Sequence, residues 1–215
     1  MSDTGIVVQK ARLTFDGANA PIIEIERTFE IRRGCSLLVA PSGGGKTSLL
    51  RLLSGWFTPS EEVRPAFELL ANYDPLRDVE FIGNHQTLLP WFSVRKNIAI
   101  RGGDLSKAEA NWRAVGLPAS TFEKYPYELS LGMYKRAELV AAYSHSPRLL
   151  LLDEFFSSLD PEASALSMAL IEAHAGAAGA VLITTHTPEA FSQVDSKLGF
   201  RYGPKRQVVD ISLLQ

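Results

Sequence analysis

The sequence predicts an α/β fold built around a mainly parallel sheet. Three segments, 35–39, 148–152 and 180–184, are dominated by Leu, Val and Ile, with little alternation between apolar and polar positions. Such runs are typical of strands that are buried on both faces, as in parallel sheets. Helical patterns separate the three segments, and strands that alternate with helices indicate parallel pairing.

The region before the first buried segment predicts an antiparallel sheet. The stretches 22–26 and 28–31 are short, rich in β-prone residues and separated by turns. A further turn leads into segment 35–39, and a glycine-rich loop follows that segment. The leucines between positions 49 and 53 then recur at helical spacing. We therefore expect an antiparallel β region followed by strand, glycine loop and helix.

The middle of the chain predicts helices. Segment 105–116 is a helix closed by glycine, and a second helix covers 131–143 and ends at a Ser-Pro pair. A further helix covers 161–175. We expect residues 81–147 to be mainly helical, whereas the polar, proline-containing stretch 58–80 receives no assignment.

The composition is that of a globular protein without a strong charge bias. The 215 residues are 46% hydrophobic and 21% charged, which suits one domain with a full core. The formal net charge of -2 gives no global basic field that would attract nucleic acid. Cys35 is the sole cysteine, so no intrachain disulfide forms, which fits a reducing compartment.

Neither a signal peptide nor a membrane-spanning segment is expected. The N-terminus lacks a basic stretch followed by an apolar one. Apolar runs stay short of the roughly 18 residues that a transmembrane helix needs. If the protein works at a membrane, we expect it to dock onto a protein already there.

The sequence between the first buried strand and its helix is typical of a phosphate-binding loop. Glycines at 43–45 let backbone N–H groups converge on a phosphate chain, and the following helix N-terminus stabilises the phosphate charge. Lys46 would reach the β- and γ-phosphates, and the Thr47 hydroxyl would hold Mg²⁺. Ala40 stands where the pattern has glycine, and the alternative is a turn that merely begins a helix. The loop predicts a site for a nucleoside triphosphate with Mg²⁺.

Polar side chains follow the other two buried strands at the point where each ends. Asp153 and Glu154 follow the second strand, and His186 follows the third. The carboxyl ends of parallel strands form the edge at which α/β sheets bind ligands. Asp153 suits the magnesium shell, Glu154 suits a general base that polarises water, and His186 could contact the γ-phosphate. Each feature alone has an ordinary structural explanation, but together they favour nucleotide hydrolysis.

With these motifs, the chain resembles the nucleotide-binding subunit of an ATP-binding cassette (ABC) transporter over nearly its whole length. Residues 40–47 resemble its Walker A loop, 149–154 its Walker B segment and 157–160 its D-loop. The resemblance implies these site residues: catalytic Glu154, His186 and Lys46; nucleotide-binding Phe15, Ala40, Pro41, Ser42, Gly43, Gly44, Gly45, Lys46, Thr47 and Ser48; and Asp160 in the D-loop.

Two further segments resemble one branch of that family. Leu88-Leu89-Pro90-Trp91 and the ending 203–209 are similar to importers of nitrate, sulfonate and taurine. The resemblance implies a P-loop NTPase core with a mainly parallel sheet and an N-terminal antiparallel β subdomain. It also implies a single domain over residues 1–215, with a helical subdomain inserted at roughly 84–146.

The resemblance implies an ATPase that couples hydrolysis to transport, most simply import of a small solute by a bacterium. Its cofactors would be ATP and Mg²⁺. Its partners would be transmembrane permease subunits, a second ABC ATPase subunit and a solute-binding protein, with no nucleic acid. The subunit would be peripheral, on the cytoplasmic face of the inner membrane.

Three positions depart from the family pattern. The signature, usually LSGGQ or LSGGM, reads LSLGM, so Ser130, Gly132 and Met133 would contact the partner's nucleotide, while Leu131 adds bulk there. By register the Q-loop glutamine is replaced by Asn84, although Gln86 lies two residues later, and either would serve the metal. The third departure is the residue after Walker B, which is phenylalanine instead of proline.

The departures leave the chain's own half of a composite site nearly complete and alter the half offered to a partner. We therefore expect any defect to fall on the partner's nucleotide. One alternative is a hydrolysis-deficient regulatory subunit paired with an active ABC ATPase. Another is a soluble ABC ATPase outside transport, which the lack of long coiled-coil insertions disfavours. The solute, the direction of transport and the choice between homodimer and heterodimer stay open.

Overall fold

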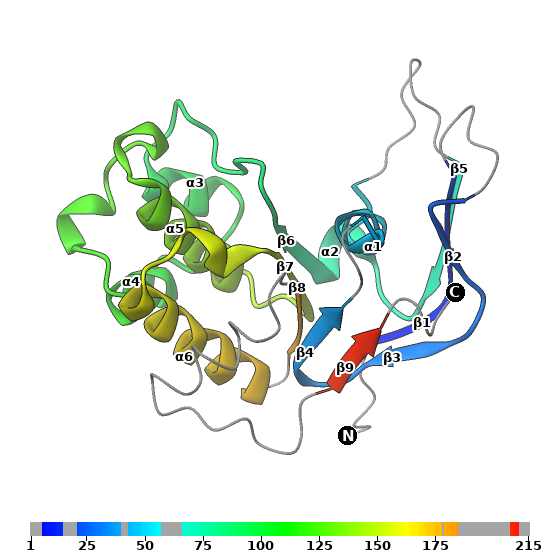
Figure 1. Cartoon of the computed structure of the whole chain (residues 1–215). Coiled ribbons are helices and arrows are strands. Elements are labelled where there is room, and N and C mark those ends of the chain that lie inside the picture. The colour runs from blue at the N-terminus through cyan, green and yellow to red at the C-terminus, as the bar shows by residue number, and fades with distance from the viewer. Residues whose placement is uncertain are drawn as a thin grey trace.

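A computed structural model of the chain describes residues 6–14, 21–39, 43–56, 66–177, 179–184 and 207–210. The described part contains an antiparallel sheet, a parallel sheet and a group of helices. In Figure 1 the antiparallel sheet and the helices α3 to α6 lie on opposite sides of the parallel sheet. The predicted α/β class with a mainly parallel sheet is confirmed.

The antiparallel sheet is organised around one long strand, β1 (Ile6–Thr14). Two short strands, β2 (Ile23–Ile25) and β3 (Phe29–Ile31), pair antiparallel with successive parts of β1. A fourth strand, β5 (Ala66–Ala71), also pairs antiparallel with β1. The antiparallel prediction for the N-terminal region is confirmed, whereas β5 falls in the stretch that received no assignment.

The parallel sheet has the strand order β6-β7-β8-β4-β9. Its strands are β6 (Val79–Ile82), β7 (Leu149–Asp153), β8 (Ala180–Thr184), β4 (Gly34–Val39) and β9 (Gln207–Asp210). All neighbouring pairs run parallel. The three predicted buried strands are confirmed as β4, β7 and β8. The region 81–147, which was predicted to be mainly helical, begins with the last two residues of β6, and β6 occupies an outer position of the sheet.

Six α-helices occur in the described part. They are α1 (Lys46–Leu53), α2 (Pro75–Asp78), α3 (Val94–Ile100), α4 (Leu105–Ala114), α5 (Leu131–Ser144) and α6 (Pro161–Ala177). The predicted helices at 105–116, 131–143 and 161–175 are confirmed as α4, α5 and α6. Asp104 caps α4 and Ser130 caps α5, each by accepting hydrogen bonds from N–H groups of the first turn. Within the described ranges, every helix is too short or too polar to span a bilayer.

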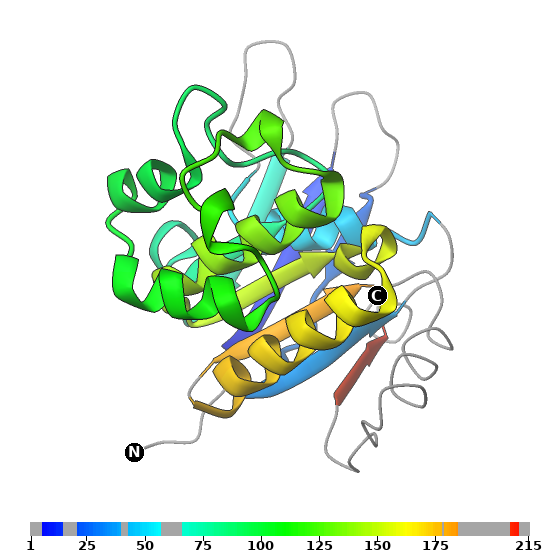
Figure 2. The same ribbon diagram turned by 90° about the vertical axis from the view of Figure 1, so that its left-hand side faces the viewer.

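Buried apolar residues form two cores on opposite faces of the parallel sheet. The β-side core joins that sheet to the antiparallel sheet and α1, and the helix-side core joins it to α3, α4, α5 and α6. Along β7, Leu149 and Leu151 face the β-side core, whereas Leu150 and Leu152 face the helix-side core. Figure 2 shows α6 lying along the sheet on the helix side. The continuous leucine run is therefore explained by a strand that serves two cores.

Candidate nucleotide-binding site

The described part of the glycine loop has the backbone shape that its sequence predicts. Gly43 and Gly45 have positive φ angles of 76° and 79°, a region that side chains disfavour. A Cβ atom on Gly45 would also lie 2.7 Å from Cδ1 of Ile23 in the antiparallel sheet. Glycine at position 45 is therefore favoured by its conformation, and a larger residue there would also displace the end of the Ile23 side chain.

The helix α1 starts directly after the loop, at Lys46. Its first turn contains Lys46, which is 7% exposed, with Thr47 and Ser48 partly buried. No acidic residue lies in that turn, so the positive end of the helix is not offset by a nearby carboxylate of its own. A loop of this shape followed by a helix N-terminus suits an anionic ligand.

A short chain of hydrogen bonds joins three elements at the edge of the parallel sheet. The Thr47 hydroxyl donates to Oδ2 of Asp153 at 2.8 Å, and the Thr184 hydroxyl donates to Oδ1 at 2.7 Å. Asp153 is only 3% exposed, so its carboxylate is held by both hydroxyls inside the protein. Residues from the ends of β7 and β8 thus meet the start of α1.

Glu154 follows this carboxylate and has a constrained backbone. Its φ of 51° and ψ of 33° lie in the left-handed region, which is uncommon for residues other than glycine. Its N–H donates to the Thr184 hydroxyl at 3.1 Å, and its carbonyl accepts from the Ser157 hydroxyl at 2.8 Å. The next residue, Phe155, is fully buried in the helix-side core. These contacts fix the direction in which the Glu154 backbone leaves the sheet.

Thr184 is a site residue to which the sequence analysis gave no role. Its hydroxyl contacts both the carboxylate of Asp153 and the backbone N–H of Glu154. The signal was present in the sequence as a hydroxyl residue at the end of an otherwise apolar strand. It carried little weight because threonine is common in strands for reasons of shape alone.

The two Q-loop candidates follow β6, next to the strand that carries Asp153. The parallel register places Ile82 opposite Leu152, so the loop after β6 leaves the same edge of the sheet. Asn84 and Gln86 are both exposed in that loop. Both therefore stay candidates for the same role.

The signature segment lies at the start of α5. The Ser130 hydroxyl caps the helix by accepting from the N–H of Met133 at 3.3 Å. Leu131 is 61% exposed, so the extra bulk points into solvent in the isolated chain. A Cβ atom on Gly132 would lie 3.4 Å from the carbonyl oxygen of Ser158, which brings the signature beside the D-loop segment.

The remaining predicted residues divide into two groups. Asp160 caps α6, since its carboxylate accepts from the N–H of Ala163 at 2.8 Å. That contact is an ordinary structural role, and a further role at a dimer interface stays a prediction. Phe15, Ala40, Pro41, Ser42 and His186 lie outside the described residues.

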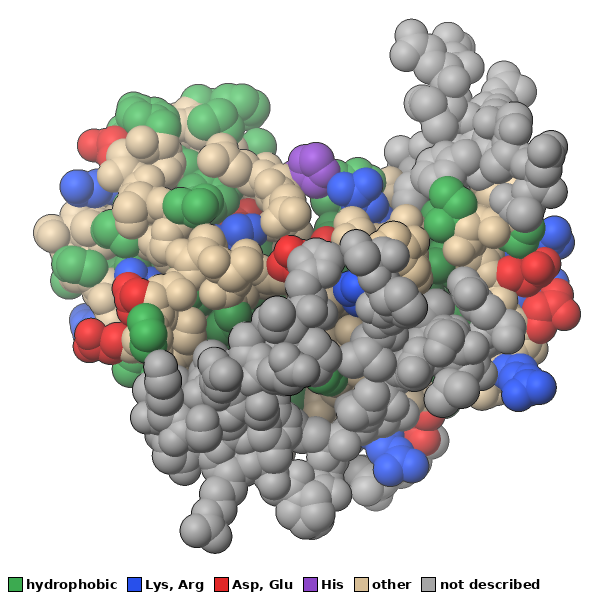
Figure 3. Space-filling view, in the orientation of Figure 1, with side chains coloured by type: hydrophobic (Ala, Val, Ile, Leu, Met, Phe, Trp, Pro, Cys, Tyr) green, Lys and Arg blue, Asp and Glu red, His purple; other side chains and the backbone are tan. Residues whose placement is uncertain are grey.

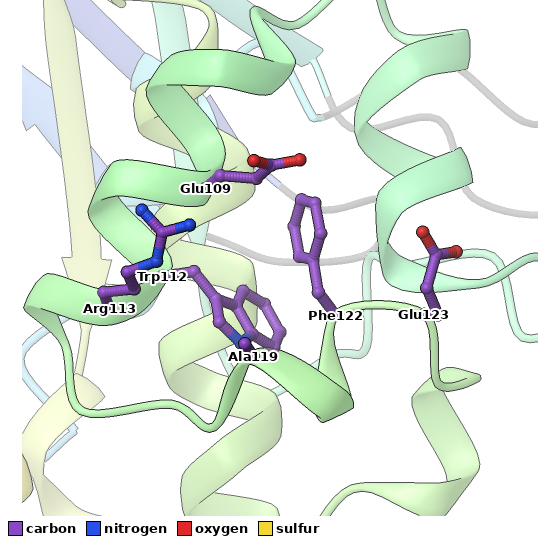
Figure 4. A pocket seen from close by; sticks show the side chains of 6 residues that line it. All are labelled: Glu109, Trp112, Arg113, Ala119, Phe122 and Glu123. Carbon is purple, nitrogen blue, oxygen red and sulfur yellow. The ribbon is translucent and has the colours of Figure 1, made fainter.

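A pocket of about 230 Å³ lies elsewhere, in the helical region. In Figure 4 the Phe122 ring stands at its centre, between the α4 side chains and Glu123. The pocket is lined by Glu109, Trp112, Arg113, Ala119, Phe122 and Glu123. These residues do not overlap with the predicted site, so the pocket is separate from the candidate nucleotide site.

The donor set at the sheet edge fits Mg²⁺. The Thr47 hydroxyl and the Asp153 carboxylate are hard oxygen donors on adjacent elements and lie within 2.8 Å of each other. Proteins usually hold Mg²⁺ with one or two such groups while phosphate oxygens and waters complete its shell. The pair therefore suits a magnesium ion that arrives with a phosphate ligand.

Solved structures share this architecture. One described as the ATP-binding subunit of an ABC transporter superposes with a TM-score of 0.70 over 93% of this chain and 95% of that chain, at 18% identity. A second, an ABC transporter ATP-binding protein from Pyrococcus furiosus, gives a TM-score of 0.69 over 98% of both chains, at 15% identity. The fold is therefore that of ABC ATP-binding subunits.

The sequence itself gives the family. The family model of the ABC transporter matches residues 27–157, and the chain belongs to that family. The predicted resemblance is therefore confirmed.

Several curated relatives are named as import ATP-binding proteins. The Fe(3+) ions import ATP-binding protein FbpC of Serratia marcescens is 35% identical over 184 residues, which are 80% of this chain and 53% of the relative. The aliphatic sulfonates import ATP-binding protein SsuB 3 of Pseudomonas syringae pv. tomato is 38% identical over 162 residues, 69% and 56% of the two chains. The thiamine import ATP-binding protein ThiQ of Cereibacter sphaeroides is 34% identical over 163 residues, 71% and 70%. The chain spans about half the length of the first relatives that it matches.

Proposed function

We propose that the chain binds ATP with Mg²⁺ and hydrolyses ATP as the energy-coupling subunit of a bacterial importer of a small solute. The observation that carries the proposal is the hydrogen-bonded group of Thr47, Asp153 and Thr184 at the sheet edge beside the glycine loop. This group unites a phosphate-binding element with a buried carboxylate. The family and the names of the import relatives support the same function.

In this proposal the phosphate chain of ATP binds to residues 40–48. Backbone N–H groups of the loop and the N-terminus of α1 would bind the phosphates, and Lys46 would neutralise the β- and γ-phosphate charge. Phe15 would stack on the adenine ring. Thr47 and Asp153 would hold Mg²⁺, which supplies charge neutralisation at the transferred phosphate.

Hydrolysis would then depend on Glu154 as the general base for the attacking water. The left-handed backbone and the hydrogen bond from its N–H to Thr184 support a fixed position for this residue. Asn84 or Gln86 would contribute a water-mediated amide to the metal, and His186 would contact the γ-phosphate. Ser130, Gly132 and Met133 would act on the nucleotide of a second ABC subunit, with Asp160 at the interface between the two.

The transport partners follow from the same proposal. Permease subunits would dock on the segment from Leu88 to Ile98, in which Trp91 is 64% exposed. Figure 3 shows hydrophobic side chains at the surface of the helix-rich half, as a docking surface requires. The chain would sit peripherally on the cytoplasmic face of the inner membrane, as one domain with the inserted helical subdomain at roughly 84–146. A solute-binding protein would complete the importer.

The test is the substitution Glu154→Gln in the purified full chain. It removes the base and keeps the phosphate loop, so ATP should still bind while turnover falls by about a hundredfold or more. The matched control is Glu162→Gln, an exposed carboxylate in the first turn of α6. Turnover would be followed by phosphate release and binding by a fluorescent ATP analogue. Undiminished turnover in the Glu154 variant would overturn the role of this residue.

A second candidate function is a regulatory subunit that binds ATP without supporting hydrolysis. The exposed Leu131 at the start of α5 favours it, because this side chain occupies the surface that would meet the partner's nucleotide. Mixing the chain with a second ABC subunit that carries an intact LSGGQ signature separates the two functions. Turnover of the ATP bound by the partner, which Leu131 would face, supports the first function, and the absence of that turnover supports the second.

A further inference from the structure

Both ends of a three-residue segment are fastened to one turn of α5. Lys135 donates from Nζ to the carbonyl oxygen of Gly83. Glu138 accepts at Oε1 from the N–H of Thr87 at 3.0 Å and from its hydroxyl at 2.8 Å. Residues 84–86, which we call the arch, lie between these two attachments.

The two fastening side chains are charged and buried. The side chain of Lys135 is 9% exposed and that of Glu138 is 1% exposed, and their Nζ and Oε2 atoms lie 3.6 Å apart. Burial raises the pKa of the Glu138 carboxyl, and the Lys135 charge and the Thr87 hydrogen bonds oppose that rise. Burying two charges is costly, and apolar residues would pack the helix at least as well. Here the two charged groups instead form hydrogen bonds with Gly83 and Thr87, the residues on either side of the arch.

The far side of the arch contacts the helix that follows the phosphate loop. His85 lies between Asn84 and Gln86, and its Nε2 is 2.9 Å from Nη2 of Arg51 in α1. The His85 ring lies 5.2 Å from the ring of Trp56, which follows α1. The arch therefore contacts both α5, which begins with the signature segment, and α1, which follows the glycine loop.

We propose that Lys135 and Glu138 are positioning residues for ATP hydrolysis, which fasten the arch so that its amides are held at the nucleotide site. This inference rests on the proposed function. Both Q-loop candidates, Asn84 and Gln86, lie inside the arch. The hydrogen bonds of Lys135 with Gly83 and of Glu138 with Thr87, which we call the clamp, therefore set the position of whichever candidate acts. Because Ser130 caps α5, these contacts also couple the arch to the helix that would contact the partner's nucleotide.

The neighbouring residue on α5 provides a matched control. Arg136 donates from Nη1 to the carbonyl of Val115 at 2.8 Å, at the end of α4. It also donates from Nε to the carbonyl of Gly132 in its own helix at 3.2 Å. Arg136 thus fastens α5 to a different loop by the same kind of contact, and among the described residues its hydrogen bonds reach Gly132, Val115 and Gly116 instead of the arch. A purely structural role for Lys135 predicts the same consequences for both substitutions.

The experiment compares Lys135→Met, Thr87→Val and the control Arg136→Met in the purified full chain. ATPase kcat and KM, affinity for a fluorescent ATP analogue with Mg²⁺, and thermal unfolding would be measured for each. We expect kcat to fall about tenfold for Lys135→Met and about threefold for Thr87→Val, with nucleotide affinity within about twofold. Arg136→Met should leave kcat within about twofold whatever its effect on thermal unfolding.

A double variant guards against misfolding, since Lys135→Met leaves a buried carboxylate without its counter-charge. Lys135→Met with Glu138→Leu removes both charges, and such replacements often preserve stability. It should unfold near the temperature of the unmodified chain and still lose kcat, because the arch is released.

The outcomes separate the two proposals. If the unmodified chain hydrolyses ATP and Glu154→Gln does not, but the folded double variant and Thr87→Val keep kcat within about twofold, the positioning role alone is overturned. Absence of ATPase activity both in the chain alone and in its mixture with an ABC subunit that carries an intact LSGGQ signature, or an active Glu154→Gln variant, overturns the proposed function and with it the inference.

Discussion

Two buried polar groups in this protein are built in different ways. At the sheet edge, Thr47 and Thr184 bind the carboxylate of Asp153, so side chains hold a side chain. On α5, Lys135 and Glu138 bind the backbone and hydroxyl of a loop. The first arrangement fixes chemical groups relative to one another, and the second fixes one segment relative to a helix. The comparison suggests that losses at the first should alter ligand binding and chemistry, whereas losses at the second should alter turnover with binding retained.

The largest expected effect lies on the sheet-edge side, at Lys46. Lys46→Ala would remove the proposed charge-assisted contact to phosphate, and nucleotide affinity should then fall by about a hundredfold. Titration with a fluorescent ATP analogue measures it, with the exposed Lys124→Ala as control. If nucleotide affinity is unchanged, the glycine loop is not the phosphate site, and the expected difference between the sheet edge and α5 is contradicted.

A smaller effect is expected at Thr184, which joins the carboxylate to the Glu154 backbone. Thr184→Val keeps the shape and removes the hydroxyl that donates to Asp153 and accepts from the N–H of Glu154. We expect kcat to fall about tenfold and the free energy of unfolding to fall by about 1–2 kcal/mol. Thr184→Ser keeps the hydroxyl and should behave like the unmodified chain. Equal kinetics for the Val and Ser variants would remove Thr184 from the site.

Leu131 tests the surface that α5 offers to a partner. Leu131→Gly removes the exposed side chain, and turnover of the assembled dimer should rise a few-fold if that bulk impedes the partner's nucleotide. Leu131→Ala separates removal of bulk from the loss of about 1 kcal/mol of helix stability that glycine causes. Unchanged turnover in both variants would show that Leu131 is no impediment.

The smallest expected effect is the pH dependence of stability that comes from Glu138. Burial raises the pKa of Glu138 above its usual value of 4.5, so the folded state binds this proton more tightly than the unfolded state. Its contribution to stability is then complete below pH 4.5 and is lost as the pH rises through the raised folded pKa. Glu138→Gln keeps an acceptor for Thr87 and removes this loss. Melting temperatures across the pH range should show the unmodified chain losing a few degrees relative to the variant on the alkaline side. A difference in melting temperature between the two proteins that stays the same at every pH would contradict the prediction.

Much of the fold and part of the site could be predicted from the sequence. The buried strands β4, β7 and β8 were visible because a strand buried on both faces is a continuous apolar run. Strands β5 and β6 were not, because short outer strands carry mixed side chains that no single period describes. The glycine loop and Asp153 could be proposed as site residues because their chemistry depends on residue type and order.

The clamp could not be predicted in this way. Lys135 and Glu138 stand three residues apart on a helix, a pattern that usually marks an exposed ion pair. Their burial depends on a loop about 50 residues earlier in the chain, and the sequence carries no local sign of that approach. The assignment of Asn84 or Gln86 stays open for the same reason, since both lie inside the arch.

The alternating leucines of β7 have a consequence for how the molecule melts. Leu149 and Leu151 belong to one core, Leu150 and Leu152 to the other, and all four are completely buried. Neither core can unfold without exposing one face of β7 to solvent. We therefore expect the two halves to lose structure in one cooperative transition, with hydrogen exchange in β7 reporting the global event.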